Sequence, residues 1–292
     1  MADEKGAKPD KPKTKAKAGG QRPDLVSIGG LVVAVGGILS GLIMDGGKMK
    51  DVQQFSAALI VVGGTLGAVM ITTPMAILLG ALGRIGAVFF EKTHTPSVVI
   101  EEIVGFATQA RKQGIVSLEQ QADRIADPFM RKALNLAIDG VEMNQLRGIM
   151  ELEITLLEQR GEAEAKVFES AGGYSPTIGI IGAVLGLMQV MKNLANIEEV
   201  GRGIATAFVA TVYGVALANI LLLPVANKLK ARVREEVHIR ELALEGILSV
   251  VEGMNPKLIR TKLEAYAPPK PASEKKAKAK PAAAGKPAPA EG

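Results

Sequence analysis

The side chains that most often carry chemistry in proteins are rare or scattered in this sequence. Its 292 residues include no Cys and only two His, His94 and His238, which lie far apart in the chain. This composition excludes a disulfide framework, a thiolate metal site and cysteine catalysis, and it offers no clustered set of metal ligands. We therefore predict a protein that is not an enzyme and that uses no cofactor and no metal.

Four long stretches of the sequence contain no Asp, Glu, Lys, Arg or His. These stretches hold 20, 32, 22 and 25 residues, at 25–44, 52–83, 170–191 and 203–227. Each meets the requirement of about 20 apolar residues for a bilayer-spanning helix. Proton and ion relays inside membranes are ordinarily built from ionisable side chains. If this chain serves ion flow, the titrating carboxylate must therefore come from another polypeptide packed against it.

The last two uncharged stretches carry small residues at helical spacing, which favours close helix approach. One stripe consists of Gly179, Gly182 and Gly186, and the other of Gly203, Ala207, Thr211, Gly214 and Ala218. The simplest interpretation is that these residues pack the two stretches against each other. Packing against a partner helix is the alternative.

Basic residues are concentrated in three parts of the chain. Residues 1–24, 84–169 and 228–292 hold 31 of the 35 Lys and Arg, and the two short loops between paired stretches hold the other four. Basic residues accumulate on the cytoplasmic side of membranes, so both termini and the middle segment are predicted to be cytoplasmic. Few aromatics accompany the charge, which favours attraction to membrane lipid over nucleic-acid binding.

The fold that would position these residues is predicted to be that of an all-α integral membrane protein. It has four transmembrane helices in two hairpins and a helical cytoplasmic domain between spans 2 and 3. The predicted segments are a disordered basic tail (1–24), transmembrane hairpin 1 (25–90), the cytoplasmic helical domain (91–170), transmembrane hairpin 2 (171–227), a cytoplasmic C-terminal helix (228–266) and a disordered Ala/Pro/Lys tail (267–292).

Turn and capping residues predict several helix boundaries. Pro74 is expected to kink the second span without ending it. In the middle segment, a helix should end near Gly114, and Ser117 with Gln120 forms a capping-box pattern for the next helix. Pro128 should begin a further helix and Gly140 should end it.

Three separated motifs resemble one membrane-protein family. They are ARKQGIVSLE (110–119), YSPTIGIIGAVLGLMQVM (174–191) and IATAFVATVYGVALANILLLPVANKL (204–229). They resemble the MotA, TolQ and ExbB family, and within it the MotA-type subunits of the bacterial flagellar stator. The resemblance covers residues 25–266 and includes the order of hairpin, cytoplasmic domain, hairpin and helix.

The resemblance implies roles for five residues of hairpin 2, which would carry the ion pathway. Pro176 and Pro224 match prolines tied to conformational change during ion passage, and Thr211 and Tyr213 match a TVYG-like segment of the fourth span. Ala183 matches a position that is typically threonine in sodium-driven relatives and alanine in proton-driven ones. A methyl group offers no oxygen ligand to a hard cation, so this residue favours protons, although Thr211 keeps one hydroxyl.

The resemblance also implies a rotor-facing surface on the cytoplasmic domain. Arg111 and Glu119 match the charged ends of an R-x-x-G-x-x-S-L-E pattern that contacts oppositely charged residues of the rotor protein FliG. Considered alone, these residues have a simpler role, since Arg111 ends one predicted helix and Glu119 begins the next. Each charge would then complement its helix dipole by about 0.3–1 kcal/mol.

The function that the resemblance implies is that of a stator subunit, which couples ion flow across the bacterial inner membrane to torque on the rotor. Several copies, a pentamer by resemblance, would surround a MotB-like single-span subunit that carries the ion-binding Asp. Two alternatives remain open at this point. One is an ExbB- or TolQ-like energiser of an envelope partner, and the other is a membrane scaffold oligomer that conducts no ions.

Overall fold

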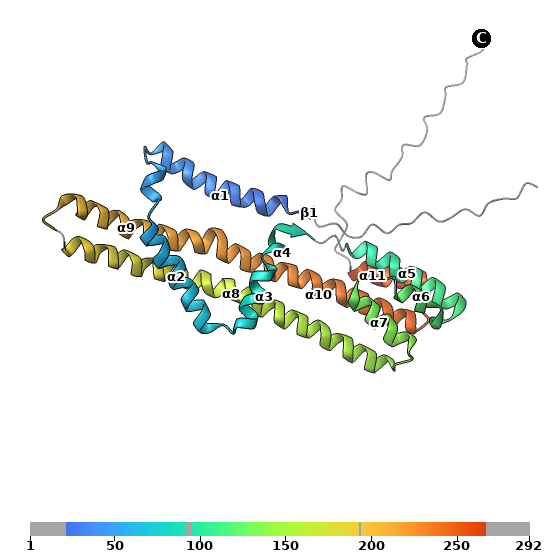
Figure 1. The fold of residues 1–292 in the computed structure, drawn as a ribbon. Coiled ribbons are helices and arrows are strands. Elements are labelled where there is room, and N and C mark those ends of the chain that lie inside the picture. Colours follow the sequence, from blue (N-terminus) through green and yellow to red (C-terminus); the bar gives the residue numbers. More distant parts are fainter. Residues whose placement is uncertain (1–21, 92–94, 193, 267–292) are drawn as a thin grey trace, which may run out of the picture. The chain divides into compact units, whose positions relative to one another are not determined.

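The computed structural model describes residues 22–91, 95–192 and 194–266, and these residues are almost entirely helical (Figure 1). In chain order the elements are β1 (Arg22–Pro23), α1 (Leu25–Met44), the 3₁₀ helix η1 (Met49–Val52), α2 (Phe55–Thr72), α3 (Met75–Arg84), α4 (Gly86–Phe89), β2 (Phe90–Glu91), α5 (Pro96–Gln113), the 3₁₀ helix η2 (Ile115–Leu118), α6 (Glu119–Ala122), α7 (Pro128–Ile138), α8 (Met143–Lys192), α9 (Ile197–Ala216), the π-helix η3 (Leu217–Leu222), α10 (Leu223–Val251) and α11 (Pro256–Tyr266). The predicted disordered tails, apart from residues 22–24, and His94 lie outside the described residues.

Four helical stretches among the described residues are long and apolar enough to cross a membrane. They are Leu25–Met44, Met49–Thr72, Met143–Lys192 and Ile197–Val251. The all-α membrane fold with four spans is therefore confirmed. The described residues form two compact units, one of residues 22–91, 126–128 and 147–241 without 193, and one of residues 95–125, 129–146 and 242–266. The predicted domain boundaries concern the membrane edges and stay predictions.

In the first unit, α8 and α9 lie side by side and antiparallel, with direct backbone contact (Figure 1). A Cβ atom on Gly179 would lie 2.9 Å from the carbonyl oxygen of Ala210, and one on Gly186 would lie 2.9 Å from that of Gly203. A Cβ on Gly214 would lie 2.6 Å from the carbonyl oxygen of Ser175. The small-residue stripes therefore pack the two helices against each other, as the simpler interpretation predicts.

Pro74 ends the second span and does not merely kink it. Helix α2 stops at Thr72, Thr73 is extended (φ −128°, ψ 127°), and Pro74 itself caps α3. The prediction of a continuous helix is wrong here because proline disfavours helical geometry at the preceding residue and removes a backbone donor. The break lets α3 leave the path of α2 and pack beside α8.

Buried carboxylates fix the peripheral elements of the first unit. Glu164 on α8 is 2% exposed, and its oxygens lie 2.5 Å from Nε of Arg84 and 3.0 Å from Nε of Arg160. Gly80 on α3 leaves room for this carboxylate, since a Cβ there would lie 2.5 Å from Oε1. An apolar core from α2, α3, α4, α8 and α10 includes Val69, Ala81, Val88, Phe168 and Leu229.

Asp24 holds the start of α1. Its Oδ1 accepts from the backbone N–H of Ser27 at 3.1 Å, and its Oδ2 lies 2.6 Å from Nζ of Lys228 and 3.1 Å from Nη2 of Arg232. Its own N–H donates to the carbonyl of Phe89 at 2.7 Å, beside the antiparallel pairing of β1 with β2. The hydrogen bond from Lys228, followed by that from Ser27, lowers the pKa of Asp24 to about 2.

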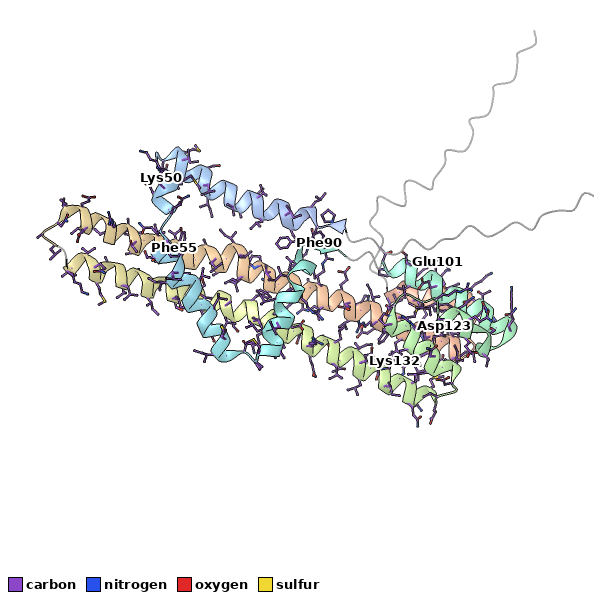
Figure 2. All side chains as sticks on the ribbon, viewed as in Figure 1. Lys50, Phe55, Phe90, Glu101, Asp123 and Lys132 are labelled. Atoms are coloured by element: carbon purple, nitrogen blue, oxygen red, sulfur yellow. The ribbon has the colours of Figure 1, made fainter. Side chains whose placement is uncertain are left out.

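The second unit is a helical bundle with its own core. Helix α5 buries Ile103 and Phe106, and α7 buries Phe129 and Leu134. Gly246 of α10 packs against Ile103, and α5 lies against α11. Glu101 on α5, labelled in Figure 2, accepts two hydrogen bonds from the Arg260 guanidinium at 2.5 and 2.7 Å. These charge-assisted bonds raise the pKa of Arg260.

Helix boundaries in the second unit mostly follow the sequence prediction. Helix α5 ends at Gln113 and is capped by Gly114, where φ is 82°, and α7 begins at Pro128 and stops before Gly140, where φ is 76°. The capping box at Ser117 is wrong. The N-cap of α6 is Leu118, with no capping hydrogen bond from a side chain, and the Ser117 hydroxyl instead donates back to the Gly114 carbonyl at 2.7 Å within the 3₁₀ turn η2.

The α8–α9 backbone contact predicts a sharp difference between two glycines. Gly214→Ala should destabilise the protein by about 1–3 kcal/mol, because the new methyl group meets backbone atoms that cannot move aside. Gly173→Ala is the control, since a Cβ there has nothing within 4 Å, and helix propensity should make it neutral or slightly stabilising. Thermal unfolding in detergent, followed by far-UV circular dichroism, measures both. Equal melting temperatures for the two variants would contradict the packing argument.

The Asp24 ion pairs predict a pH-dependent loss of stability. Because the pKa of Asp24 is lowered from 3.8 to about 2, its carboxylate stabilises the folded chain above about pH 4. That contribution falls away as the pH drops toward 2. Asp24→Asn keeps a capping side chain but no charge, so it should cost about 1–2 kcal/mol at neutral pH and almost nothing at pH 2.

The matched control is Asp45→Asn at the other end of α1, where the side chain is exposed. It should change the unfolding free energy by less than about 0.5 kcal/mol at every pH. A difference between wild type and Asp24→Asn that stays constant from pH 7 to pH 2 would sink the assignment.

Candidate functional site

Helices α8 and α9 meet along a contact line that runs through Gly179, Gly186 and Gly214. One side of this line is covered by another helix and the other side is not. Helix α2 covers the first side, where Ala57 packs with Val209 and Ala210. Gly182 of α8 approaches Ile60 of α2 on this side as well. The other side is exposed in the single chain and presents large apolar residues, namely Ile180, Leu187, Ile204, Phe208 and Val215.

Pro176, Ala183 and Thr211 lie together along the uncovered side. Pro176 and Ala183 are seven residues apart, so they share a stripe of α8, and both are half-buried beside the contact line. Thr211 follows Ala210 on α9, and its Cα lies 3.5 Å from where a Cβ of Gly179 would be. Three of the five predicted pathway residues are therefore neighbours on one face.

The Thr211 hydroxyl is engaged only as a donor within its own helix. It donates to the Ala207 carbonyl at 3.2 Å, a bond that leaves the oxygen lone pairs directed away from the helix backbone. Ala183 adds only a methyl group to the same face. This face thus offers an apolar surface with one hydroxyl, onto which a partner helix could place an acid.

Tyr213 lies on the covered side, away from the other pathway residues. Its hydroxyl donates to the carbonyl of Val52 in η1, and it accepts a longer bond of 3.5 Å from the N–H of Gln54. The Gln54 amide oxygen accepts in turn from Thr206 at 3.1 Å. Since residues two apart in a helix point to nearly opposite faces, the spacing of Thr211 and Tyr213 already indicated this separation.

Pro224 follows a π-helical segment that the sequence analysis missed. Segment η3 interrupts the α-helical register at Leu217–Leu222, and Pro224 is the second residue of α10, with an exposed side chain. Proline has no N–H for the carbonyl of residue 220, which is a physical reason for the change of hydrogen-bonding register just before it. The proline in the sequence indicated a disturbance of the helix here, but it did not indicate that the helical turn would widen to a π-helix.

Ser175 is a second residue that sequence reasoning missed. It is completely buried, and its hydroxyl donates across the contact line to the Gly214 carbonyl at 2.9 Å. This is the only side-chain hydrogen bond between α8 and α9 that is described along their contact line. Its donor, Ser175, directly precedes Pro176, and its acceptor, Gly214, lies three residues before η3. A small polar residue before a proline inside an apolar stretch was the available signal.

Arg111 and Glu119 flank an exposed turn of the second unit. Arg111 lies in the last turn of α5 and Glu119 is the first residue of α6. Both side chains are exposed, and within the described residues neither pairs with an opposite charge. Gln109 donates to the Ser117 carbonyl at 2.9 Å and accepts from Gln121, which fixes the turn. Two free opposite charges are thus held in place, with Val116 exposed between them.

Few other side chains outside these two surfaces are of the types that bind metals or transfer protons. Among the described residues no group of three His, Asp or Glu side chains is close enough to hold a metal ion. His238 is partly exposed on α10, with Nδ1 3.9 Å from Oε2 of Glu241. The surfaces of interest are therefore the uncovered face of α8 and α9 and the turn between α5 and α6.

Comparison with known proteins agrees with this geometry. The model of the MotA/TolQ/ExbB proton channel family matches residues 121–242, and that of the Motility protein A N-terminal family matches residues 28–114. Motility protein A of Bacillus subtilis is 35% identical over 251 residues, which is 85% of this chain and 92% of that protein. Motility protein A of Helicobacter pylori is 35% identical over 84% of this chain and 96% of its own length.

A solved structure shows the same fold. The flagellar MotAB stator complex from Bacillus subtilis contains a chain that superposes with a TM-score of 0.80 at 34% identity, over 88% of this chain and 100% of that one. Family models, relatives and fold agree over nearly all of the described residues. The chain belongs to the MotA/TolQ/ExbB proton channel family, on its motility protein A branch.

Proposed function

We propose that this chain is the MotA-type subunit of a flagellar stator in the bacterial inner membrane, where it couples ion flow to torque on the rotor. One observation carries the proposal. The stretches 170–191 of α8 and 203–227 of α9, η3 and α10 hold no Asp, Glu, Lys, Arg or His, and α8 and α9 expose a face there on which Pro176, Ala183 and Thr211 lie together. Such a face needs a partner that supplies the acid.

The partner that fits this face is a MotB-like single-span subunit whose helix carries the ion-binding Asp. The solved relative is a MotAB complex, which supports this pairing. Several copies of the chain, five by family resemblance, would surround that helix, each presenting its uncovered α8–α9 face. The distribution of Lys and Arg supports both termini on the cytoplasmic side.

Coupling ion flow to motion requires two packing arrangements of the ring, and ion binding must change which of the two is favoured. One elementary charge moving down 100 mV releases about 2.3 kcal/mol. Pro176 and the η3–Pro224 segment are the points where α8 and the α9–α10 run depart from regular helical hydrogen bonding. Bending at these points is the least costly way to change how the helices meet the partner.

The charged turn between α5 and α6 would pass this motion to the rotor protein FliG. Arg111 and Glu119 are exposed, unpaired among the described residues and held on a turn that Gly114 shapes. Pairing of these two residues with charges of opposite sign on the rotor would give the contact its specificity and register.

The two alternatives have less support. An ExbB- or TolQ-like energiser would not account for the match of residues 28–114 to the Motility protein A N-terminal family. A non-conducting scaffold would not account for the proton channel family match or for the grouping of Pro176, Ala183 and Thr211 on one face.

Charge reversal at the α5–α6 turn tests the rotor contact. Arg111→Glu or Glu119→Lys should leave membrane insertion and assembly intact and lower the torque by about half or more, because a favourable pair becomes a repulsive one. Rotation of tethered cells under load measures torque. Lys257→Glu reverses an equally exposed charge on α11 and is the matched control. Full torque in both turn variants would refute this interface.

Ion dependence tests the proposed function as a whole. Expressed with a MotB-type partner in a non-motile host, the chain should restore swimming at every sodium concentration and in the presence of a sodium-channel blocker. The chain alone should conduct no ions, because it lacks the intramembrane acid. Strict sodium dependence would overturn the preference for protons, and conduction by the chain alone would overturn the division of labour between the two subunits.

A further inference from the structure

A cavity of about 360 Å³ lies in the first unit, between α1 and the segment formed by η3 and the start of α10. Its volume falls in the range of small-molecule sites, which is about 300–1,000 Å³. Neither Ala183 nor Thr211 borders the cavity, so it is separate from the uncovered face of α8 and α9.

The walls of this cavity are apolar along most of their length. Helix α1 contributes the half-buried stripe of Leu31 and Ala34, α4 contributes Val88 and Phe89, and the opposite wall includes Leu221. Ser27, Leu39 and Leu42 of α1 are half-buried as well, and no residue of α1 is fully buried. An unfilled space of this size forfeits dispersion contacts on every side, and apolar walls do not retain water.

One end of the cavity is polar and cationic. Lys228 lines it, together with the Ser27 hydroxyl. Among the described residues Asp24 is the only acceptor for the Lys228 ammonium, which has three donors. Asp24 also pairs with Arg232, and Arg232 pairs with the exposed Glu235 at 3.1 Å. The Asp24 side chain is 9% exposed and that of Lys228 is 32% exposed, so the cation is the more accessible of the two charges.

We infer that this cavity binds a membrane phospholipid, with one acyl chain between α1 and η3 and the headgroup phosphate against Lys228. This inference rests on the location of the chain in a membrane and does not depend on its role in a stator. Hydrocarbon is the medium that surrounds α1, and basic pockets between membrane helices on the cytoplasmic side favour anionic headgroups. Lys228 lies next to Pro224 in the cavity lining, so the lipid contacts the segment where α9 changes its helical register.

Lipid retention by the intact complex, purified with its partner, tests this site. Native mass spectrometry counts bound phosphatidylglycerol and phosphatidylcholine after detergent washing. Ala34→Phe fills the cavity without changing any charge and should remove one retained phosphatidylglycerol per chain. The control is Val33→Phe, one residue along α1 at a position 74% exposed, which should retain the wild-type number.

Lys228→Gln separates the phosphate contact from the acyl contact. This variant should lose the preference for phosphatidylglycerol over phosphatidylcholine while still binding lipid, and inorganic phosphate alone should not raise the melting temperature of the wild type. Equal phosphatidylglycerol retention in Ala34→Phe and wild type would overturn the site, as would an unchanged lipid preference in Lys228→Gln. If Ala34→Phe blocks self-assembly with no effect on lipid retention, a second copy of the chain fills the cavity and the inference is wrong.

Discussion

The structure of the membrane part depends on direct backbone contact between α8 and α9. At Gly179, Gly186 and Gly214 the two helices approach so closely that a single added methyl group would meet a backbone atom. Lipid tails are as apolar as leucine side chains, so burying apolar side chains between helices gives little net free energy of association in a bilayer. Close approach supplies dispersion contacts instead, and it also lets the buried Ser175 hydroxyl reach the Gly214 carbonyl.

This contact divides the pair of helices into two functional sides. On one side α2 and the Tyr213 hydrogen bond to η1 fix hairpin 1 to α9. On the other side Pro176, Ala183 and Thr211 face outward among exposed apolar residues. The internal contact and the open side therefore lie on different sides of the same helix pair.

Much of the fold follows from the positions of charged residues and prolines. The uncharged stretch between Asp24 and Asp45 gives the bounds of α1, and Gly114, Pro128 and Gly140 mark helix ends where expected. The break at Pro74 and the π-helical turn before Pro224 were not predicted, since a proline alone does not determine whether a helix bends, widens or stops.

The spacing of the candidate residues could be predicted from the sequence, but most of their contacts could not. The grouping of Pro176, Ala183 and Thr211 follows from helical spacing, whereas the anchoring contact of Tyr213 with Val52 depends on where hairpin 1 packs. Ser175 also gave only a weak signal, because a buried serine in a membrane helix usually bonds to its own helix and here it bonds to the neighbouring one.

Asp24, the acid at the start of α1, holds structure together through ion pairs, and this makes it a poor ion carrier. The pKa of Asp24 is lowered to about 2 by Lys228 and Ser27, so this carboxyl group stays ionised at neutral pH. A proton carrier must instead have a pKa near the ambient pH, where it binds and releases protons readily. Asp24 does not meet this requirement, which is consistent with the proposal that a partner helix brings the carboxylate to the uncharged face beside Thr211.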